Sequence, residues 1–419
     1  MAETITPAQS QPPAGPLAGL KVLELGTLIA GPFAARLLAE FGAEVIKIES
    51  PANAEGQGGD PLRTWRHLHN GTSLWWAVQA RNKHSLALNL KHPEGQRIAL
   101  ALVEEADIVI ENFRPGTIEK LGLGEAELRA RNPGLILVRI SGFGQTGPYQ
   151  DRPGFGAIGE SMGGLRYVTG YPDRPPVRVG VSIGDSISSL HAVMGALMAL
   201  HHRDKTRSPA NPKGEGQVVD VALYESVFNM MESLVPEYAV HGAIRERTGA
   251  SLPGIVPSNT YACADGQSIV IGGNGDAIFK RLMLVIGRPD LAGDPALQTN
   301  DGRVLQTEQI DTAIATWCAQ QDRASALTAL QAAEVPASQI YSVADMFQDP
   351  QFAARQMLES HQLADGTPIT LPGITPKLSQ TPGATRWLGP NLGEHTTAVL
   401  TRLGYTPAQI EHLREQGVI

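Results

Sequence analysis

The chain has 419 residues, of which 42 % are hydrophobic and 18 % charged, proportions typical of a soluble globular protein of two or three domains. Its formal net charge is −8 and no block of lysines or arginines stands out, so a nucleic-acid partner is not expected. The net charge does not exclude an anionic ligand, because a local pocket can be basic on an acidic protein.

The two cysteines, Cys263 and Cys318, form no CxxC motif, so neither a disulfide framework nor a structural zinc site is expected. This usage suits a reducing cytosol, and we expect a cytoplasmic protein without a bound metal. The polar, proline-rich residues 1–16 predict a flexible tail rather than a signal peptide. No apolar run has the length expected of a membrane span, so no membrane partner is predicted.

The N-terminal half alternates apolar runs with helical patterns. Strands are predicted at 21–25, 44–48, 85–90, 107–111 and 135–140. Amphipathic patterns between them predict helices, including 33–41 and 94–105. This alternation is typical of an open parallel α/β sheet with helices on both faces, so the predicted fold class is α/β with a large Rossmann-like domain.

The second half is expected to hold a smaller α/β domain. The stretch 203–217 is polar, with two prolines and two glycines, and predicts a linker. A long helix is predicted at 220–240, and a strand at 268–271. The predicted plan is a flexible tail at 1–16, the first part of the large domain at 17–205, a linker at 206–224, the small domain at 225–330 and a C-terminal segment at 331–419.

Asp185 is the leading candidate for chemistry. It ends an apolar run, and the residues that follow repeat apolar side chains at a spacing of three and four, which predicts a helix. A carboxylate is therefore expected where a strand meets a helix, with Gly184 allowing another molecule to approach closely. The same position suits an Asp that only caps the helix, and the segment alone does not decide between the two roles.

Two glycine-containing turns follow predicted strands. The first, Gly26–Pro32, and the acid Glu49 occupy positions used by dinucleotide-binding folds, but the turn is not GxGxxG, so a plain turn is favoured. The second consists of Gly272, Gly273, Asn274 and Gly275. It is either a tight turn or a loop that approaches a ligand. The histidines lack metal-ligand spacing.

Several segments together resemble one family, the class III CoA-transferases, which includes formyl-CoA transferase and the carnitine CoA-transferases. The match runs from about Leu17 to Ile419, in the order of the family. Its segments are 17–25, Ala30-Gly31-Pro32, 38–49, Asn82-Lys83-His84-Ser85, 111–116, Ser141-Gly142-Phe143-Gly144, Gly184-Asp185, 216–220 and 392–396. Each segment is weak alone, but the ordered set over most of the chain is specific.

The resemblance implies that Asp185 is the nucleophile and that coenzyme A or acyl-CoA is bound as a substrate. It implies that Gly272, Gly273, Asn274 and Gly275 form a loop near the thioester. It also implies an interlocked homodimer, each chain a ring threaded through the other, in which the C-terminal segment returns to the large domain. The implied CoA contacts are Thr27, Leu28, Ile29, Ala30, Leu88, Asn89, Leu90, Lys91, Asn112, Phe113, Arg114, Lys120 and Arg152.

Two departures from the family narrow the expected activity. Phe155-Gly156 stands where formyl-CoA transferase has Tyr-Glu and the related acyl-CoA racemases have His-Asp, and Gly275 stands where the racemases have Glu. Formate and oxalate are therefore not the expected acids. A racemase would lack the acid and base that serve its α-carbon.

The expected function is CoA transfer from a donor acyl-CoA to a free carboxylic acid, through aspartyl anhydride and aspartyl-CoA thioester intermediates. Arg178 and Arg247 could neutralise a second carboxylate, which favours a dicarboxylate such as succinate, glutarate or a hydroxylated relative. The alternatives are an acyl-CoA racemase or epimerase and a non-catalytic CoA-binding protein.

Overall fold

The structure is a computed structural model that describes residues 15–419. Nearly all of the predicted tail at 1–16 lies outside the described residues. The chain divides into two compact units. The first unit contains the chain up to Leu165 together with Val179–Glu232 and Gln356–Ile419, and the second contains Arg166–Arg178 and Ser233–Arg355.

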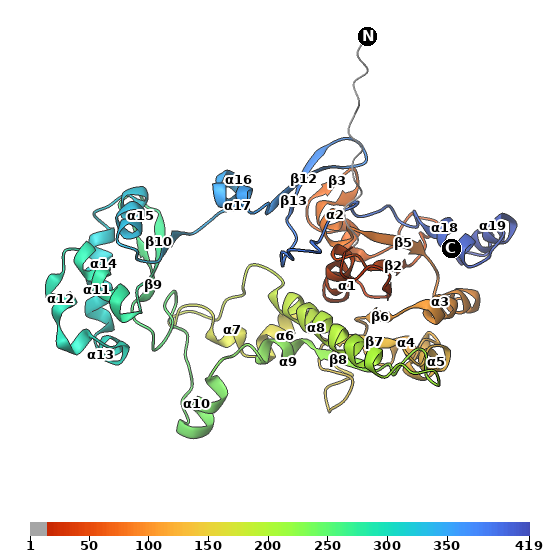
Figure 1. The fold of residues 1–419 in the computed structure, drawn as a ribbon, viewed down its shortest axis with the longest axis horizontal. Coiled ribbons are helices and arrows are strands. Elements are labelled where there is room, and N and C mark those ends of the chain that lie inside the picture. Colours follow the sequence, from red (N-terminus) through yellow and green to blue (C-terminus); the bar gives the residue numbers. More distant parts are fainter. Residues whose placement is uncertain (1–14) are drawn as a thin grey trace, which may run out of the picture. The chain divides into compact units, whose positions relative to one another are not determined.

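The first unit is built on a six-stranded sheet in which every neighbouring pair is parallel (Figure 1). The spatial order is β5-β2-β1-β6-β7-β8, which is the doubly wound order of a Rossmann-like sheet. The direction of winding reverses between β1 and β6. The strands are β1 Lys21–Glu24, β2 Glu44–Glu49, β5 Lys83–Ala87, β6 Ile108–Glu111, β7 Ile136–Ser141 and β8 Val218–Ala222.

Helices cover both faces of this sheet, because successive strand residues point to opposite sides. Val22 and Val45 pack with α1 (Ala30–Glu40) and α8 (Ile183–Lys205). Leu23 and Ile46 pack on the opposite face, against helices from both ends of the unit. These helices are α3 Pro93–Glu105, α5 Glu125–Arg131, α18 Thr396–Arg402 and α19 Pro407–Glu415. The predicted α/β layer with helices on both faces is confirmed.

Helix α8 is long and apolar enough to cross a membrane by length and composition, so the expectation that no segment reaches that length is wrong. Its small residues Ala192, Ala196 and Ala199 are buried in the core against the sheet. A core helix of a folded domain passes the same test of length and composition, and one face of α8 is buried against the sheet.

The C-terminal segment returns to the first unit and covers the outer edge of β5. His395 donates its backbone N–H to the Ser85 carbonyl at 3.0 Å. The Thr396 hydroxyl accepts the Ala87 N–H at 3.0 Å. An uncovered edge strand presents unpaired backbone groups, and here side chains and backbone from the end of the chain satisfy them.

The second unit holds a three-stranded antiparallel sheet of order β11-β10-β9, with helices packed around its apolar core. Its elements are α10 Leu234–His241, β9 Ser258–Ala262, β10 Ser268–Gly272, α11 Asp276–Val285, α12 Pro289–Gly293, α13 Asn300–Leu305, α14 Thr307–Cys318, α15 Arg323–Ala332, β11 Ala337–Gln339, α16 Val343–Gln348 and α17 Pro350–Ala354. The remaining short elements are the 3₁₀ turns Pro61–Thr64 and Pro295–Leu297, β3 Leu68–His69, β4 Thr72–Ser73, α2 Leu74–Gln79, α4 Thr117–Lys120, α6 Gly156–Met162, α7 Leu165–Val168, α9 Leu223–Phe228, β12 Leu358–Gln362 and β13 Pro368–Pro372.

The boundaries differ from the predicted plan around the linker. The range 206–224 includes β8, and the helix predicted at 220–240 is instead the end of β8 followed by α9 and α10. The strand forms because Val218–Ala222 pairs in register with Leu137–Ser141 of β7. This long-range pairing overrides the local helical pattern. The larger segment of the second unit accordingly begins at Ser233 and extends to Arg355.

We predict that Thr396→Val destabilises the chain by about 1–3 kcal/mol, because it leaves the Ala87 N–H unpaired while keeping the shape of the side chain. Denaturant unfolding followed by circular dichroism measures this change. Thr401→Val is the matched control, because that hydroxyl is exposed and only bonds the carbonyl of its own helix. Equal unfolding midpoints for the two variants would contradict this role for Thr396.

Candidate active site

The crevice where the winding reverses lies between the ends of β1 and β6. The loop Gly26–Ile29 follows β1, and Asn112 follows β6. The Thr27 N–H donates to Asn112 Oδ1 at 2.8 Å, and Asn112 Nδ2 donates to the Thr27 carbonyl at 2.9 Å. A Cβ on Gly26 would lie 2.8 Å from Asn112 Oδ1, so the turn needs glycine to admit the amide. Doubly wound folds bind ligands in this crevice.

Asp185 lies in the first turn of α8, where the N-terminal end of the helix dipole stabilises a carboxylate. The N-cap residue is Ser182, so Asp185 is not the N-cap that its residue type suggested. No strand precedes α8 in residues 171–182, and a loop leads to the helix instead of the expected strand. Pro175 and Pro176 account for this, since neither can donate to a strand ladder.

Two contacts place the start of α8. The Ser189 hydroxyl lies 2.7 Å from the Ala30 carbonyl and 2.8 Å from the Asp185 carbonyl. It therefore holds the first turns of α8 against the beginning of α1. Asp185 lies one turn before Ser189 on the same side of the helix, and its carboxylate packs against Gly156 at the start of α6.

Glycine at position 156 makes room for the carboxylate. A Cβ on Gly156 would lie 2.0 Å from Asp185 Oδ2, so no other residue fits there without displacing the acid. The approach of α6 to α8 also needs Gly184, whose Cβ would lie 3.0 Å from the Gly156 carbonyl oxygen. The Phe155-Gly156 departure therefore has a direct spatial consequence at Asp185.

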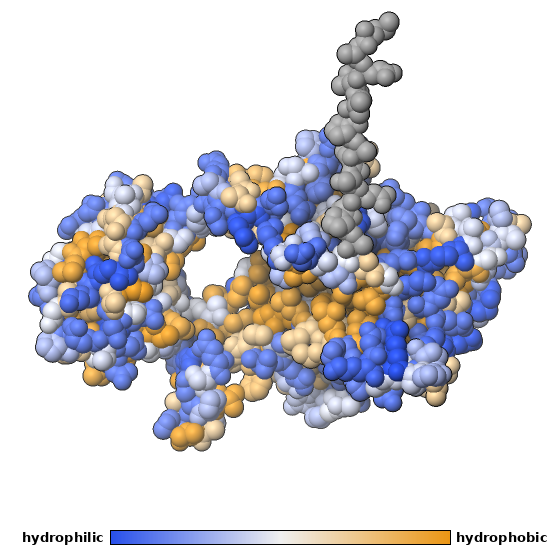
Figure 2. All heavy atoms as spheres, viewed as in Figure 1, coloured by the Kyte–Doolittle hydropathy of each residue, from blue (hydrophilic) through white to orange (hydrophobic). Residues whose placement is uncertain are grey.

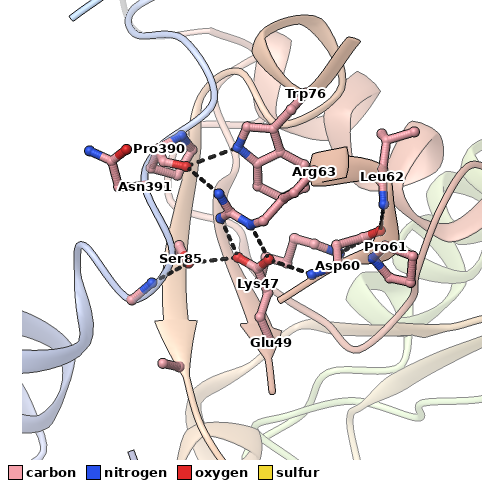
Figure 3. A network of polar contacts seen from close by, with 12 residues as sticks. Lys47, Glu49, Asp60, Pro61, Leu62, Arg63, Trp76, Ser85, Pro390 and Asn391 are labelled. Carbon is pink, nitrogen blue, oxygen red and sulfur yellow. Dashed lines mark hydrogen bonds and ion pairs between the residues drawn. The ribbon is translucent and has the colours of Figure 1, made fainter. Parts of the chain in front are cut away.

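A network of buried charges lies beneath the loop after β1 (Figure 3). Arg63 pairs with both carboxylate oxygens of Glu49 at 2.8 Å, and the Ser85 hydroxyl donates to Glu49 Oε1 at 2.6 Å. Lys47 Nζ lies 2.8 Å from Asp60 Oδ2. Burial alone would raise the pKa of both acids, but Arg63 lowers that of Glu49 and Lys47 lowers that of Asp60 below their ordinary values.

Glu49 is therefore not a ribose-binding acid, because Arg63 and Ser85 occupy its oxygens. The sequence reasoning missed Lys47, Asp60 and Arg63 as members of this network, and two signals could have found them. Lys47 is a charge between the apolar residues Ile46 and Ile48 of a buried strand. The segment Gly59–Arg63 places a glycine, an acid and a base within five residues.

The other predicted CoA contacts fall into three groups at the same edge of the sheet. Residues 27–30 follow β1, 88–91 follow β5 and 112–114 follow β6, and the carboxyl ends of neighbouring parallel strands meet at one edge. The Leu88 side chain is buried in the core, which leaves only its backbone for a ligand. The Asn89 side chain accepts the Lys91 N–H at 3.1 Å. Leu90 and Phe113 are both partly buried and pack against the core.

The other basic residues predicted to contact ligands lie outside these three groups. Lys120 ends α4, and the Arg152 guanidinium lies 3.5 Å from the centre of the Tyr149 ring. Arg247 donates to the Tyr167 carbonyl at 2.8 Å within the second unit. These positions leave their predicted ligand roles untested.

The loop Gly272–Gly275 lies in the second unit, between β10 and α11. Arg303 anchors this loop, because its Nη2 donates to the Asn274 carbonyl at 2.6 Å. A role of this loop near a thioester stays a prediction. Over residues 15–419, no group of three or more His, Cys, Asp or Glu side chains is arranged to hold a metal ion.

Comparisons with known proteins agree on one family. The model of CoA-transferase family III matches residues 17–396. The chain is 48 % identical to the succinyl-CoA–D-citramalate CoA-transferase of Chloroflexus aurantiacus, over 98 % of this chain and 100 % of that protein. It is 37 % identical to the succinate–glutarate CoA-transferase of Agrobacterium fabrum, over 93 % of this chain and 96 % of that protein. A crystal structure of a CAIB/BAIF family protein from Brucella suis superposes with a TM-score of 0.79 at 34 % identity, covering 93 % of this chain and 100 % of that one.

We predict that acid destabilises the chain through Glu49 and Asp60. Both have a folded-state pKa below the ordinary value, so their contribution is present above the unfolded pKa of 4.5 and 3.8, respectively, and is lost as pH falls through the folded values. The free energy of unfolding, measured in urea from about pH 6 to about pH 3, should therefore decrease.

Glu49→Gln should lower the free energy of unfolding at neutral pH and make its decrease with acid shallower. The exposed Glu55→Gln is the matched control and should reproduce the wild-type curve. A Glu49→Gln curve parallel to wild type would show that this carboxylate does not carry the acid dependence.

Proposed function

Because the chain belongs to CoA-transferase family III, we propose that it transfers coenzyme A from a donor acyl-CoA to a free dicarboxylate, with Asp185 as the nucleophile. The observation that carries the proposal is the place of Asp185. It lies in the first turn of α8, against Gly156, and Ser189 ties that part of the helix to the beginning of α1. The relatives named for citramalate and glutarate support dicarboxylates as the acids.

The proposed reaction proceeds by covalent catalysis. The Asp185 carboxylate attacks the thioester carbonyl of the donor, which forms an aspartyl–acyl anhydride and releases CoA as its thiolate. The thiolate then attacks the aspartyl carbonyl, forms an aspartyl-CoA thioester and expels the donor acid. The acceptor carboxylate attacks this thioester and gives a second anhydride and thiolate. Attack of the thiolate on the acceptor acyl carbon releases the new acyl-CoA and the free Asp185 carboxylate.

The environment of Asp185 supports this role. The first turn of a helix stabilises the ionised carboxylate, which is the nucleophilic form. Glycine at 156 carries no carboxylate at that position. The same glycine removes the acid–base partner that a racemase or epimerase would need there. Binding of CoA without catalysis does not require a carboxylate at position 185 that packs against Gly156.

The remaining predicted contacts would bind the CoA substrate. Thr27, Leu28, Ile29 and Ala30 would lie along the pantetheine arm, with the segments 88–91 and 112–114 and the basic residues Lys120 and Arg152 toward the nucleotide. Basic side chains suit a polyanionic substrate. The loop Gly272–Gly275 would cover the reacting groups and exclude water, which would otherwise hydrolyse the anhydrides. Neither the acceptor acid nor the donor requires a metal in this scheme.

We also propose that the chain acts as a cytoplasmic homodimer. Large apolar side chains of α6 and α8 are exposed, and apolar surface gathers over these helices in Figure 2. Exposed apolar patches of this kind mark interaction surfaces. The residues are Phe155, Ile158 and Met162 on and beside α6, and Leu190, Met194 and Met198 on α8.

We predict that Asp185→Ala lowers CoA exchange by about 10³-fold or more while CoA still binds, because the variant retains the CoA contacts but not the acyl carrier. A panel of acyl-CoA donors and free carboxylic acids, read by mass spectrometry, measures exchange. The exposed Asp301→Ala serves as the control. Hydroxylamine with acyl-CoA should label Asp185, and a label on another residue would overturn the assignment. Solvent deuterium at the α-carbon without an acceptor acid would indicate a racemase.

We predict that Gly156→Ala reduces kcat strongly, by about 10²-fold, because the added methyl group collides with Asp185 Oδ2 and turns the carboxylate away from its position. Gly293→Ala is the matched control, since a Cβ there meets no atom within 4 Å. Steady-state kinetics and thermal unfolding are measured for both variants. Wild-type kcat in Gly156→Ala would show that this fit is irrelevant to catalysis.

A further inference from the structure

Leu28 adopts an unusual backbone conformation in the loop after β1. Its φ is +64°, in the left-handed region that a residue with a side chain rarely occupies. The loop leads directly into α1 at Ala30, whose carbonyl is bound by the Ser189 hydroxyl of the Asp185 helix. A change in the backbone at Leu28 therefore lies two residues from the contact that places Asp185.

One buried side chain holds this conformation. The Leu28 N–H donates to Asp60 Oδ1 at 3.0 Å and to Asp60 Oδ2 at 3.1 Å. Asp60 is only 2 % exposed. Charge-assisted hydrogen bonds to a buried carboxylate are among the strong ones, so this pair can offset the cost of the left-handed backbone.

Lys47 holds Asp60 and the start of the loop together. Its ammonium group lies 2.8 Å from Asp60 Oδ2, 2.7 Å from Glu24 Oε1 and 2.7 Å from the Gly26 carbonyl. These three partners use all three N–H donors of the ammonium group. The acid that bonds Leu28 is thus fixed by a cation that also bonds the first residue of the loop.

The neighbouring peptide groups of the loop have other partners. Asn112 binds both the N–H and the carbonyl of Thr27. Gln79 Nε2 donates to the Ile29 carbonyl at 3.1 Å and lies 3.5 Å from the Leu28 carbonyl oxygen. Neither residue contacts the Leu28 N–H. The strained residue of the loop is therefore the one that Asp60 holds.

We propose that Asp60 is a positioning residue for CoA transfer, which holds Leu28 in its left-handed conformation and so shapes the loop that carries the thioester past Asp185. The inference rests on the proposed function. Asp60 is buried and acts through the loop, not by touching the reacting atoms. Displacements of about 1 Å at a reacting centre can cost about 10²-fold in rate.

The experiment compares Asp60→Asn with wild type in the full chain, using the donor and acceptor pair found active. The expected result is a kcat lower by about 10²-fold per folded enzyme, with a much smaller change in the KM of the donor. Glu40→Gln is the matched control. That carboxylate is also buried and bound by two arginines, at 2.5 Å and 3.0 Å, but does not contact the loop. It should lower thermal stability and leave kcat per folded enzyme near wild type.

Replacement of Leu28 separates positioning from stability. Glycine occupies positive φ readily and alanine does not. Added to Asp60→Asn, Leu28→Gly should therefore give a kcat about tenfold above that with Leu28→Ala, although both remove the same side chain. Equal kcat values for the two double variants would overturn the proposal. A loss of activity that only follows the folded fraction of Asp60→Asn would also overturn it.

Asp60→Glu covers the case in which Asp60→Asn does not fold, since it keeps a charge opposite Lys47 and moves the carboxylate by one methylene. It should also lower kcat, with the same rescue by Leu28→Gly over Leu28→Ala, and a wild-type kcat would contradict the positioning role. Absence of CoA transfer in the wild-type chain would instead overturn the proposed function.

Discussion

Five buried charges and the partly buried Arg63, on and next to β1, β2 and β5, are the constraint on which the candidate site depends. Each buried ion costs several kcal/mol in desolvation unless it is paired, and here three acids face three bases. Lys83 and Lys47 share Glu24, but Lys47 also has Asp60. Burial accordingly lowers the pKa of Lys83 to about 8, whereas the carboxylates raise that of Lys47 above its ordinary value despite its burial. The six are Glu24, Lys47, Glu49, Asp60, Arg63 and Lys83.

The same network joins parts of the chain that are far apart in the sequence. Arg63 donates to the Pro390 carbonyl at 3.1 Å, and the Ser85 hydroxyl accepts the Gly393 N–H at 2.9 Å. The indole N–H of Trp76 donates to the same Pro390 carbonyl at 2.9 Å. The returning C-terminal segment and the loop after β1 therefore share one set of buried polar groups, which explains how a site near the start of the chain depends on residues near its end.

Small residues decide what the carboxylate at the start of α8 can do. Gly156 and Gly184 let α6 approach α8 closely, and Ser189 fastens α8 to the beginning of α1. A larger residue at any of these positions would move the carboxylate relative to the loop after β1. The acid is thus placed by the close packing around it, while the charge network bonds the loop after β1 through Asp60 and Lys47.

The sequence by itself determined the parallel α/β layer, because apolar runs and helical spacing are local patterns. The ordered family motifs in the sequence also identified Asp185 as the candidate nucleophile. The comparisons with known proteins confirm the family. Only the tertiary structure decided that Val218–Ala222 is a strand, since that depends on pairing with β7. It alone decided that Asp60 bonds Leu28, 32 residues away. Periodicity describes neighbours along the chain, whereas ion pairs, hydrogen bonds between distant residues and the space left by Gly156 exist only once the chain is packed.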